Sequence, residues 1–355
     1  MTKRLMALGT SLVALAGAAV AALSLTGAGA TFPYPMYSKW FNEYHKLHPD
    51  IEINYQSIGS GGGIKQVTEG TVDFGASDGP MNDQQIAEFR QKHSCDILHF
   101  PTVLGADVPT YNIPGVTAQL DFTPDALAGI FLGKITKWND PDIQKANPNV
   151  GLPNRDVVVV HRSDGSGTTY VWVDYLSKVS PEWKQKVGVG TSVNWPVGLG
   201  GKGNEGVSGQ IRQIQYSIGY VELVYAIQNK LPYGRVRNQA GNFTKADLTS
   251  VTAAAAGAAA NMPNDFRVSI TNAPGGNAYP ISSFTWLLIP SKIQDPAKEK
   301  AIKDFVRWML GPGQQYTEAL AYAQLPKQVV AKERKALGKV GGGAVSTGNM
   351  DRKSP

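Results

Sequence analysis

Three glycine-rich segments place small or hydroxyl residues where the apolar pattern predicts the end of a strand or the start of a helix. They cover residues 27–33, 59–63 and 163–168. The start of a helix exposes unpaired backbone N–H groups, and glycine lets an anion come close to them. One such segment is more often a plain connection. Three of them, together with Arg162 and Asp78, predict a site for an oxyanion.

Arg162 follows the apolar run 157–160, which predicts a strand buried on both faces. Open α/β folds bind ligands beyond the carboxyl ends of such strands, and a guanidinium can bind two oxygens of an oxyanion. In a simpler interpretation, Arg162 lies at the surface and pairs with Asp164. Both interpretations can hold together, because Asp164 would then fix the guanidinium in place.

Asp78 contradicts a simple anion site, because a carboxylate repels an anion unless the anion has a proton to donate. Hydrogen phosphate and dihydrogen phosphate carry such a proton, whereas sulfate at neutral pH carries none. Sulfate would therefore face a buried negative charge with no hydrogen bond between them. The residue predicts a site that prefers phosphate to sulfate.

Two other functions stay open at this point. An exported phosphomonoesterase would use Ser60 or Ser166 as nucleophile, but such a serine needs a nearby base or metal, and His161 is predicted on the opposite strand face from Arg162. A binding protein for sulfate, molybdate or an organic phosphate is the second alternative. A nucleotide P-loop is excluded, because Gln66 follows Lys65 where a Ser or Thr is required.

The composition narrows the class of protein. The chain has 355 residues, of which 42% are hydrophobic and 17% charged, enough for two domains with buried cores. Cys95 is the single cysteine, so no intrachain disulfide can form, and the five histidines are too scattered for a recognised metal site. The formal net charge is +6, but Lys and Arg are spread along the chain, which argues against nucleic acid as a partner. We expect neither a metal nor a cofactor.

The N-terminus predicts export. Lys3 and Arg4 precede an apolar stretch at 5–25 with small residues at Ala19 and Ala21, which is typical of a signal peptide (residues 1–21) cleaved after Ala21. An uncleaved membrane anchor is the alternative, because the stretch is nearly long enough to span a bilayer. There is no cysteine at the cleavage site to carry a lipid. We therefore expect a soluble exported protein.

Helical and strand-like apolar spacing alternate along the rest of the chain, which predicts an α/β fold with a mostly parallel sheet. The predicted helices cover 37–47, 64–68, 82–91, 125–132, 298–309 and 328–337, with another that begins near Ser166. The predicted strands cover 51–55, 72–77, 97–104, 157–160, 218–221 and 284–289. The Gly- and Ser-rich tail at 341–355 is expected to be flexible.

Five segments make the chain resemble the periplasmic phosphate-binding protein of the phosphate-specific ABC transport system. They are LTGAGATFP at 25–33, VDFGASD at 72–78, LGKI at 132–135, DGSGT at 164–168 and WPVGLGGKG at 195–203, and the likeness weakens only after about residue 325. The resemblance implies a two-lobe periplasmic-binding-protein fold of type II. Lobe I would comprise 22–104 plus about 280–340, and lobe II 105–279. The two hinge strands are expected near 103–109 and between 269 and 281.

The resemblance also implies the ligand, the site and the partners. The ligand would be inorganic phosphate, enclosed between the lobes and handed to the membrane permease subunits of an ABC transporter with its cytoplasmic ATPase, and the protein would be a periplasmic monomer. The residues implied as phosphate ligands are Thr31, Phe32, Ser60, Asp78, Arg162, Ser166, Gly167 and Thr168, with Asp164 behind Arg162.

Two departures from the family pattern affect the site and the hinge. Gly61 stands where relatives often have a second Ser, so a hydroxyl donor is missing while the backbone N–H remains. Asp107 and Pro109 interrupt an otherwise apolar hinge strand, which puts the hinge geometry in question.

Overall fold

A central mixed β-sheet organises residues 22–342, which are the residues that the computed structural model describes. Within this range the strand order is β2-β1-β3-β11-β4-β8-β6-β7. The strands are β1 (Leu23–Gly29), β2 (Ile51–Ser57), β3 (Phe74–Ser77), β4 (Ile97–Asn112), β6 (Val158–Arg162), β7 (Leu199–Gly201), β8 (Ser217–Glu222) and β11 (Ser282–Pro290). A small second sheet contains β5 (Asp121–Phe122), β9 (Arg235–Arg237) and β10 (Phe243–Thr244).

The long strand β4 connects two groups of parallel strands. We call β1, β2, β3 and β11 the first half of the sheet, and β6, β7 and β8 the second half. Strands β1, β2 and β3 are parallel, as are β6, β7 and β8, while β11 and β4 run antiparallel to their neighbours. The register pairs β4 with β11 up to Ala106 and with β8 from Asp107 onward. One strand therefore passes from one half into the other.

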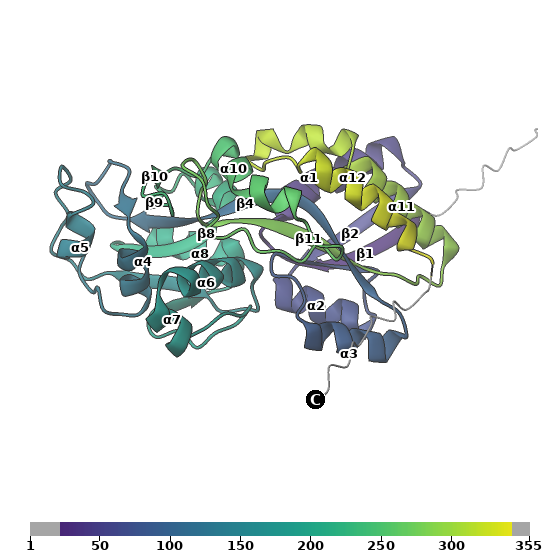
Figure 1. Cartoon of the computed structure of the whole chain (residues 1–355), viewed down its shortest axis with the longest axis horizontal. Coiled ribbons are helices and arrows are strands. Elements are labelled where there is room, and N and C mark those ends of the chain that lie inside the picture. The colour runs from purple at the N-terminus through teal and green to yellow at the C-terminus, as the bar shows by residue number, and fades with distance from the viewer. Residues whose placement is uncertain (1–21, 343–355) are drawn as a thin grey trace, which may run out of the picture.

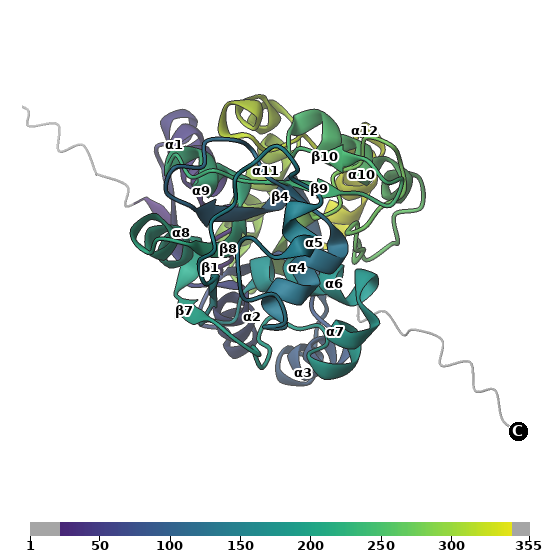
Figure 2. The same ribbon diagram turned by 90° about the vertical axis from the view of Figure 1, so that its left-hand side faces the viewer.

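Helices cover both faces of each half (Figure 1). In the first half, α1, α11 and α12 lie on one side of the sheet and α2 and α3 on the other. Figure 2 views the molecule from the end that carries α4 and α5. The helices are α1 (Tyr34–Leu47), α2 (Ser60–Glu69), α3 (Asp83–His93), α4 (Pro124–Phe131), α5 (Pro141–Gln144), α6 (Gly167–Val179), α7 (Pro181–Lys186), α8 (Gly203–Gln213), α9 (Leu223–Gln228), α10 (Leu248–Ala260), α11 (Pro296–Met309) and α12 (Lys327–Ala336).

Local sequence explains where several of these helices begin. Thr123 caps α4 by accepting a hydrogen bond from the Ala126 N–H at 3.1 Å, and Pro124 fills the first helical position, where no N–H is needed. In α1, Tyr37, Trp40 and Tyr44 bury one face, as their spacing predicts. Leu47 is 60% exposed, contrary to that prediction, because the helix ends there.

The structure corrects some predicted elements. The strand predicted from Val72 begins only at Phe74, because Asp73 instead accepts hydrogen bonds from Thr26. The strand at 157–160 is not buried on both faces: Val158 is partly exposed, since β6 lies next to the short edge strand β7. Helix α10 was not predicted, because its run of alanines has no clear apolar face.

Proline in β4 is tolerated where the ladder of hydrogen bonds is already irregular. The pairing of β4 with β11 shifts register between Thr285 and Trp286, where Pro101 lies opposite Trp286. A bulge is a usual place for a strand proline, because the missing N–H costs no regular ladder bond there. Asp107 and Pro109 leave the strand continuous across the point where it changes partners.

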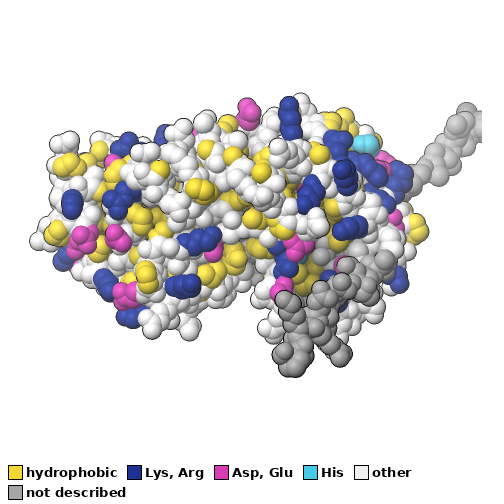
Figure 3. Space-filling view, viewed as in Figure 1, with side chains coloured by type: hydrophobic (Ala, Val, Ile, Leu, Met, Phe, Trp, Pro, Cys, Tyr) yellow, Lys and Arg dark blue, Asp and Glu magenta, His cyan; other side chains and the backbone are white. Residues whose placement is uncertain are grey.

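The surface view in Figure 3 is hollowed on its lower side, between the two halves of the sheet. In the range 22–342, no helix has the length and apolar character needed to cross a membrane. Cys95 is buried. The predicted signal peptide at 1–21 lies outside the described residues, as does the predicted flexible tail apart from Gly341 and Gly342.

Candidate functional site

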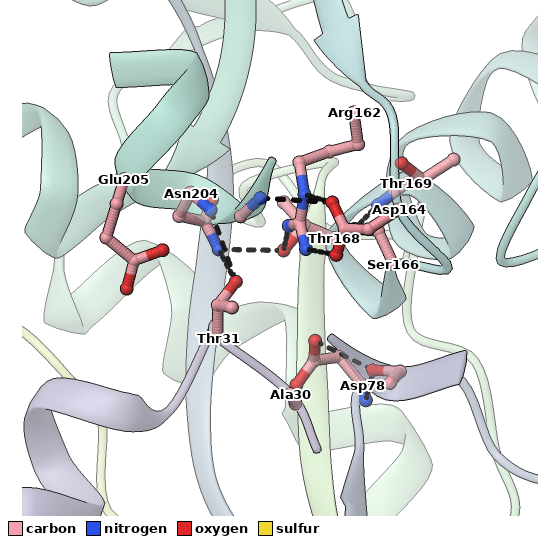
Figure 4. A network of polar contacts seen from close by, with 12 residues as sticks. Ala30, Thr31, Asp78, Arg162, Asp164, Ser166, Thr168, Thr169, Asn204 and Glu205 are labelled. Carbon is pink, nitrogen blue, oxygen red and sulfur yellow. Dashed lines mark hydrogen bonds and ion pairs between the residues drawn. The ribbon is translucent and has the colours of Figure 1, made fainter. Parts of the chain in front are cut away.

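The ends of strands and the starts of helices bring the predicted residues together from both halves. Thr31 and Phe32 follow β1, Ser60 is the first residue of α2, and Asp78 directly follows β3. From the second half, Arg162 ends β6, and Ser166, Gly167 and Thr168 open α6. Except for Gly167, which has no side chain, these residues are at most 3% exposed. Figure 4 shows Thr31 and Asp78 facing Arg162 and Thr168 across the site.

Asp78 lies on the first-half side, where its carboxyl meets hydroxyl groups. Thr285 Oγ1 donates to one carboxyl oxygen at 2.7 Å, and Ser60 Oγ lies 3.5 Å from the other. The Asp78 N–H donates to Ser60 Oγ at 3.2 Å. Burial raises the pKa of Asp78 to about 7, although the Thr285 hydrogen bond and the positive charge of Arg162 oppose this shift. The carboxyl can therefore hold or release a proton near neutral pH.

Arg162 lies on the second-half side in a bidentate pair with Asp164. Its Nε donates to Oδ1 at 2.8 Å and its Nη2 to Oδ2 at 2.6 Å. Burial opposes charge on either group, yet this contact keeps the pKa of Arg162 above its ordinary value and that of Asp164 below it. The Gly203 N–H also donates to Asp164 Oδ1 at 3.0 Å. The guanidinium is thus charged and fixed in orientation.

The start of α6 supplies hydrogen-bond donors to the same place. Ser166 caps the helix by accepting from the Thr169 N–H at 2.9 Å, which leaves the N–H groups of Gly167 and Thr168 without a partner inside the helix. A Cβ atom on Gly167 would overlap Asp78 Oδ2 and Ser60 Oγ. Only glycine lets the helix start approach the opposite side this closely.

Contacts between the two halves surround the site. The Gly61 N–H donates to the Gly165 carbonyl at 2.8 Å, so the N–H expected to remain for an anion serves this contact instead. A Cβ on Gly61 would lie 3.0 Å from the Gly165 Cα, which leaves little room for the serine that the family resemblance implies at this position. The Tyr225 hydroxyl donates to the Thr31 carbonyl at 2.6 Å. The halves are closed on each other.

Sequence reasoning missed two side chains of the site, Thr285 and Asn204. Asn204 is fully buried, and its Nδ2 donates to Thr31 Oγ1 at 2.8 Å and to Thr168 Oγ1 at 3.0 Å. Its only sequence signal was its place after the glycine-rich segment 195–203. Thr285 lies within an apolar strand, and nothing in its local pattern points to Asp78.

Within residues 22–342, neither of the two serines proposed as alternative nucleophiles forms a hydrogen bond with a histidine. Ser60 Oγ contacts Asp78, and Ser166 Oγ caps α6. His161 Nδ1 faces the Arg162 carbonyl at 3.0 Å, and its ring stacks on Trp195 at 4.8 Å between centroids. Among the residues that the structure describes, no cluster of three or more His, Cys, Asp or Glu side chains is arranged to hold a metal ion.

Comparison with known proteins identifies the class first. The model of the PBP superfamily domain matches residues 16–312. A structure described as a high-affinity periplasmic phosphate-binding protein (PfluDING) bound with phosphate superposes with a TM-score of 0.71 at 22% identity, covering 88% of this chain and 93% of the other. A putative phosphate ABC transporter substrate-binding protein from Clostridium perfringens gives a TM-score of 0.62 at 16% identity, over 86% of this chain and 100% of the other. The α/β fold is that of a substrate-binding protein of the PBP superfamily.

Curated relatives narrow the class to one family. The phosphate-binding protein PstS of Pasteurella multocida is 46% identical over 333 residues, which are 94% of each chain. The PstS protein of Methanocaldococcus jannaschii is 42% identical and covers 85% of this chain and 82% of its own. The chain belongs to the PstS family of phosphate-binding proteins.

Proposed function

We propose that this chain binds inorganic phosphate between the two halves of its sheet and delivers it to an ABC-type phosphate importer. The observation that carries the proposal is the pairing of one fixed guanidinium, Arg162, with one carboxyl that titrates near neutrality, Asp78. The relatives named PstS support the same ligand. They are named as binding proteins, and the comparisons offer no support for a phosphomonoesterase or for another oxyanion as cargo.

The proposed ligand set surrounds the anion with dipoles and a single positive charge. Arg162 binds phosphate oxygens through the guanidinium nitrogen that is not engaged with Asp164. The N–H groups of Phe32, Ser60, Gly167 and Thr168 and the hydroxyls of Thr31, Ser60, Ser166 and Thr168 donate to the remaining oxygens. Hydrogen bonds from such fixed dipoles replace the hydration shell without adding net charge to the buried site.

Asp78 is proposed to select the ligand by its protonation state. A complex of hydrogen phosphate with Asp78 contains one proton that the carboxyl and a phosphate oxygen can share. Sulfate brings no proton, so its complex would either place two negative charges side by side or confine Asp78 to its protonated form, which becomes more costly as the pH rises above about 7. Phosphate is therefore favoured as the physiological ligand.

Closure is proposed to report occupancy to the transporter. We assign lobe I to residues 22–104 plus about 280–340 and lobe II to 105–279, with β4 as one hinge strand where it changes partners after Ala106. Because the ligand touches both lobes only when they are closed, it stabilises the closed state by its difference in affinity for the two states. The permease subunits and their ATPase would then recognise the closed shape. We further propose that the protein is exported with cleavage after Ala21 and acts as a periplasmic monomer.

Native mass spectrometry of the protein purified without added ligand tests the proposed function. We expect a retained mass of one phosphate, and isothermal titration of phosphate-stripped protein should give one site per chain. Absence of binding would overturn the proposal. A chromogenic phosphate ester serves as the control for the enzymatic alternative, because a binding protein gives no turnover of it.

A further inference from the structure

Asn204 links the two sides of the site through both of its amide hydrogens (Figure 4). Its Nδ2 donates to Thr31 Oγ1 of the first half and to Thr168 Oγ1 of the second. The residue is fully buried at the start of α8, and none of the sequence motifs assigned it a role. Both hydrogens of its side-chain amide are therefore used within the described part of the chain.

The backbone N–H of Glu222 fixes the orientation of the Asn204 side-chain amide. The backbone N–H of Glu222 donates to Asn204 Oδ1 at 3.0 Å. An amide N–H can only donate, so the atom that it meets must be the oxygen. The nitrogen therefore faces Thr31 and Thr168, and both of its hydrogens point toward their hydroxyl oxygens.

This arrangement decides what the two hydroxyls can still do. A threonine hydroxyl has two lone pairs and one hydrogen. Thr168 Oγ1 accepts from Asn204 Nδ2 and from Arg162 Nη1 at 3.3 Å, and Thr31 Oγ1 accepts from Asn204 Nδ2 and from the Asn204 N–H, also at 3.3 Å. Both lone pairs of each oxygen are occupied. Each hydroxyl is left with its hydrogen alone.

Neither hydrogen has an acceptor within the described residues. Both hydroxyls are buried, so each needs an acceptor that is bound in the site between the halves, which is a water molecule in the ligand-free protein and the ligand when it binds. Resting on the proposed function, we infer that Asn204 is a positioning residue that turns the Thr31 and Thr168 hydroxyls into obligatory donors to phosphate oxygens.

The consequence is a specific orientation of the anion. Oxygens that face Thr31 and Thr168 must carry no proton, because these hydroxyls cannot accept. Asp78 supplies a carboxyl that can accept a hydrogen bond from the anion. A hydrogen phosphate therefore binds with its P–OH group toward Asp78 and its unprotonated oxygens toward the two threonines. Asn204 thus contributes to selectivity without touching the ligand.

Asn147 provides a matched control for the effect of removing a buried amide. It is 4% exposed, its Oδ1 accepts from the Asp121 N–H at 2.8 Å, and its Nδ2 donates to the carbonyls of Asp121 and Ile143, each at 2.9 Å. Its side chain, like that of Asn204, donates two hydrogen bonds and accepts one. It contacts none of the proposed phosphate ligands.

The test measures phosphate affinity by calorimetry and stability by thermal unfolding for Asn204→Ala and Asn147→Ala. Both substitutions should lower Tm. Only Asn204→Ala should lower the affinity for phosphate, by about tenfold or more, because the hydroxyls of Thr31 and Thr168 are then no longer aligned to donate to the charged ligand. A second variant, Asn204→Ser, should lose less affinity than Asn204→Ala, because its single hydroxyl hydrogen can still be donated to one of the two threonines.

A double-mutant cycle with Thr168→Val separates positioning from a simple role in closure. If Asn204 orients the Thr168 hydroxyl, Thr168→Val should cost several-fold less affinity in the Asn204→Ala background than in the wild type. Additive losses would overturn the inference, as would unchanged affinity of Asn204→Ala. If the wild-type chain binds no phosphate, the proposed function is wrong. If the wild type binds phosphate but the variants behave as just described, only the role of Asn204 is wrong.

Discussion

Asp78 and Asp164 lie on opposite sides of one site, and their surroundings shift the pKa of the two carboxyls in opposite directions. Asp164 forms two hydrogen bonds with a guanidinium, and its pKa falls below the ordinary value despite burial. In the described part of the chain, Asp78 is hydrogen-bonded only to neutral groups, and burial raises its pKa to about 7. The same residue type therefore has two roles: Asp164 keeps a cation in place, and Asp78 exchanges a proton.

The contrast shows how a site can bind an anion beside a carboxyl. Asp164 partly neutralises Arg162, so the second-half side carries little net charge and relies on oriented dipoles. On the first-half side, the carboxyl of Asp78 need not repel the ligand, because a proton can be shared between the carboxyl and a phosphate oxygen. Each side can be altered independently, which makes the comparison testable.

Removing the guanidinium should have the largest effect on phosphate binding. Arg162→Met leaves the phosphate without a cation and Asp164 without its partner, so we expect phosphate affinity to fall by about a hundredfold or more. Arg235→Met is the matched control, since Arg235 makes the same bidentate contact with Asp121, at 2.6 and 2.7 Å, away from the site. Calorimetric titration of both variants checks this, and equal affinity in the two would refute the assignment of Arg162.

The stability of the phosphate-free protein should reveal the raised pKa of Asp78. Its folded pKa of about 7 exceeds the unfolded value of 3.8, so the folded state binds the proton more tightly and is stabilised by it at low pH. That stabilisation is lost as pH rises from about 4 to about 7, by up to roughly 4 kcal/mol. Asp78→Asn should flatten this part of the curve. Denaturant unfolding across the range tests the difference, and parallel curves for both proteins would contradict it.

Removing the partner of Arg162 should lower phosphate affinity less than removing Arg162 itself. Asp164→Asn keeps the shape of the side chain but loses the charge that orients Arg162, and we expect phosphate affinity to fall by about tenfold. The pH profile of binding should stay as in the wild type, because Asp78 is untouched. A changed pH profile would show that the two carboxyls do not have separate roles.

A smaller effect on stability than that of Asp78 concerns another buried carboxyl, at the point where β4 changes partners. Asp107 lies opposite Glu222, and neither of its carboxyl oxygens has a hydrogen-bond partner in the described structure. Burial, and then the nearby Asp78 and Glu222, raise its pKa well above the ordinary value. Asp107→Val should therefore raise stability by about 1–2 kcal/mol at pH 8.

The gain from Asp107→Val should be smaller at pH 5 than at pH 8, because a raised pKa favours the neutral carboxyl as the pH falls, and burial of the neutral form costs less. Thermal unfolding of the phosphate-free proteins at the two pH values measures the change. A loss of stability at pH 8 would contradict the prediction.

The sequence predicted those parts of the site that depend on local order along the chain. Arg162 was expected at the end of a strand because an apolar run precedes it, and Ser166 was expected at the mouth of a helix because small residues lead into apolar spacing. Both predictions of local structure are confirmed. The alternation of helices and strands likewise gave the α/β class.

Contacts between distant segments could not be predicted in the same way. Asn204 meets Thr31 across 173 positions, and Thr285 meets Asp78 across 207, and only the closure of the halves and the central place of β11 bring them together. The use of the Gly61 N–H by the Gly165 carbonyl has the same origin. The spacing of apolar and polar residues predicts local helices and strands, but it does not predict which strands are neighbours in the sheet.

Competition between phosphate and sulfate, measured on the wild type and on Asp78→Asn at pH 8, above the pKa of about 7 of Asp78, tests the central claim most directly. The account predicts that the wild type binds labelled phosphate in the presence of a large excess of sulfate, and that Asp78→Asn, whose amide can donate to sulfate, loses most of this preference. A wild type that binds both anions equally, or an Asp78→Asn variant that discriminates as the wild type does, would contradict it.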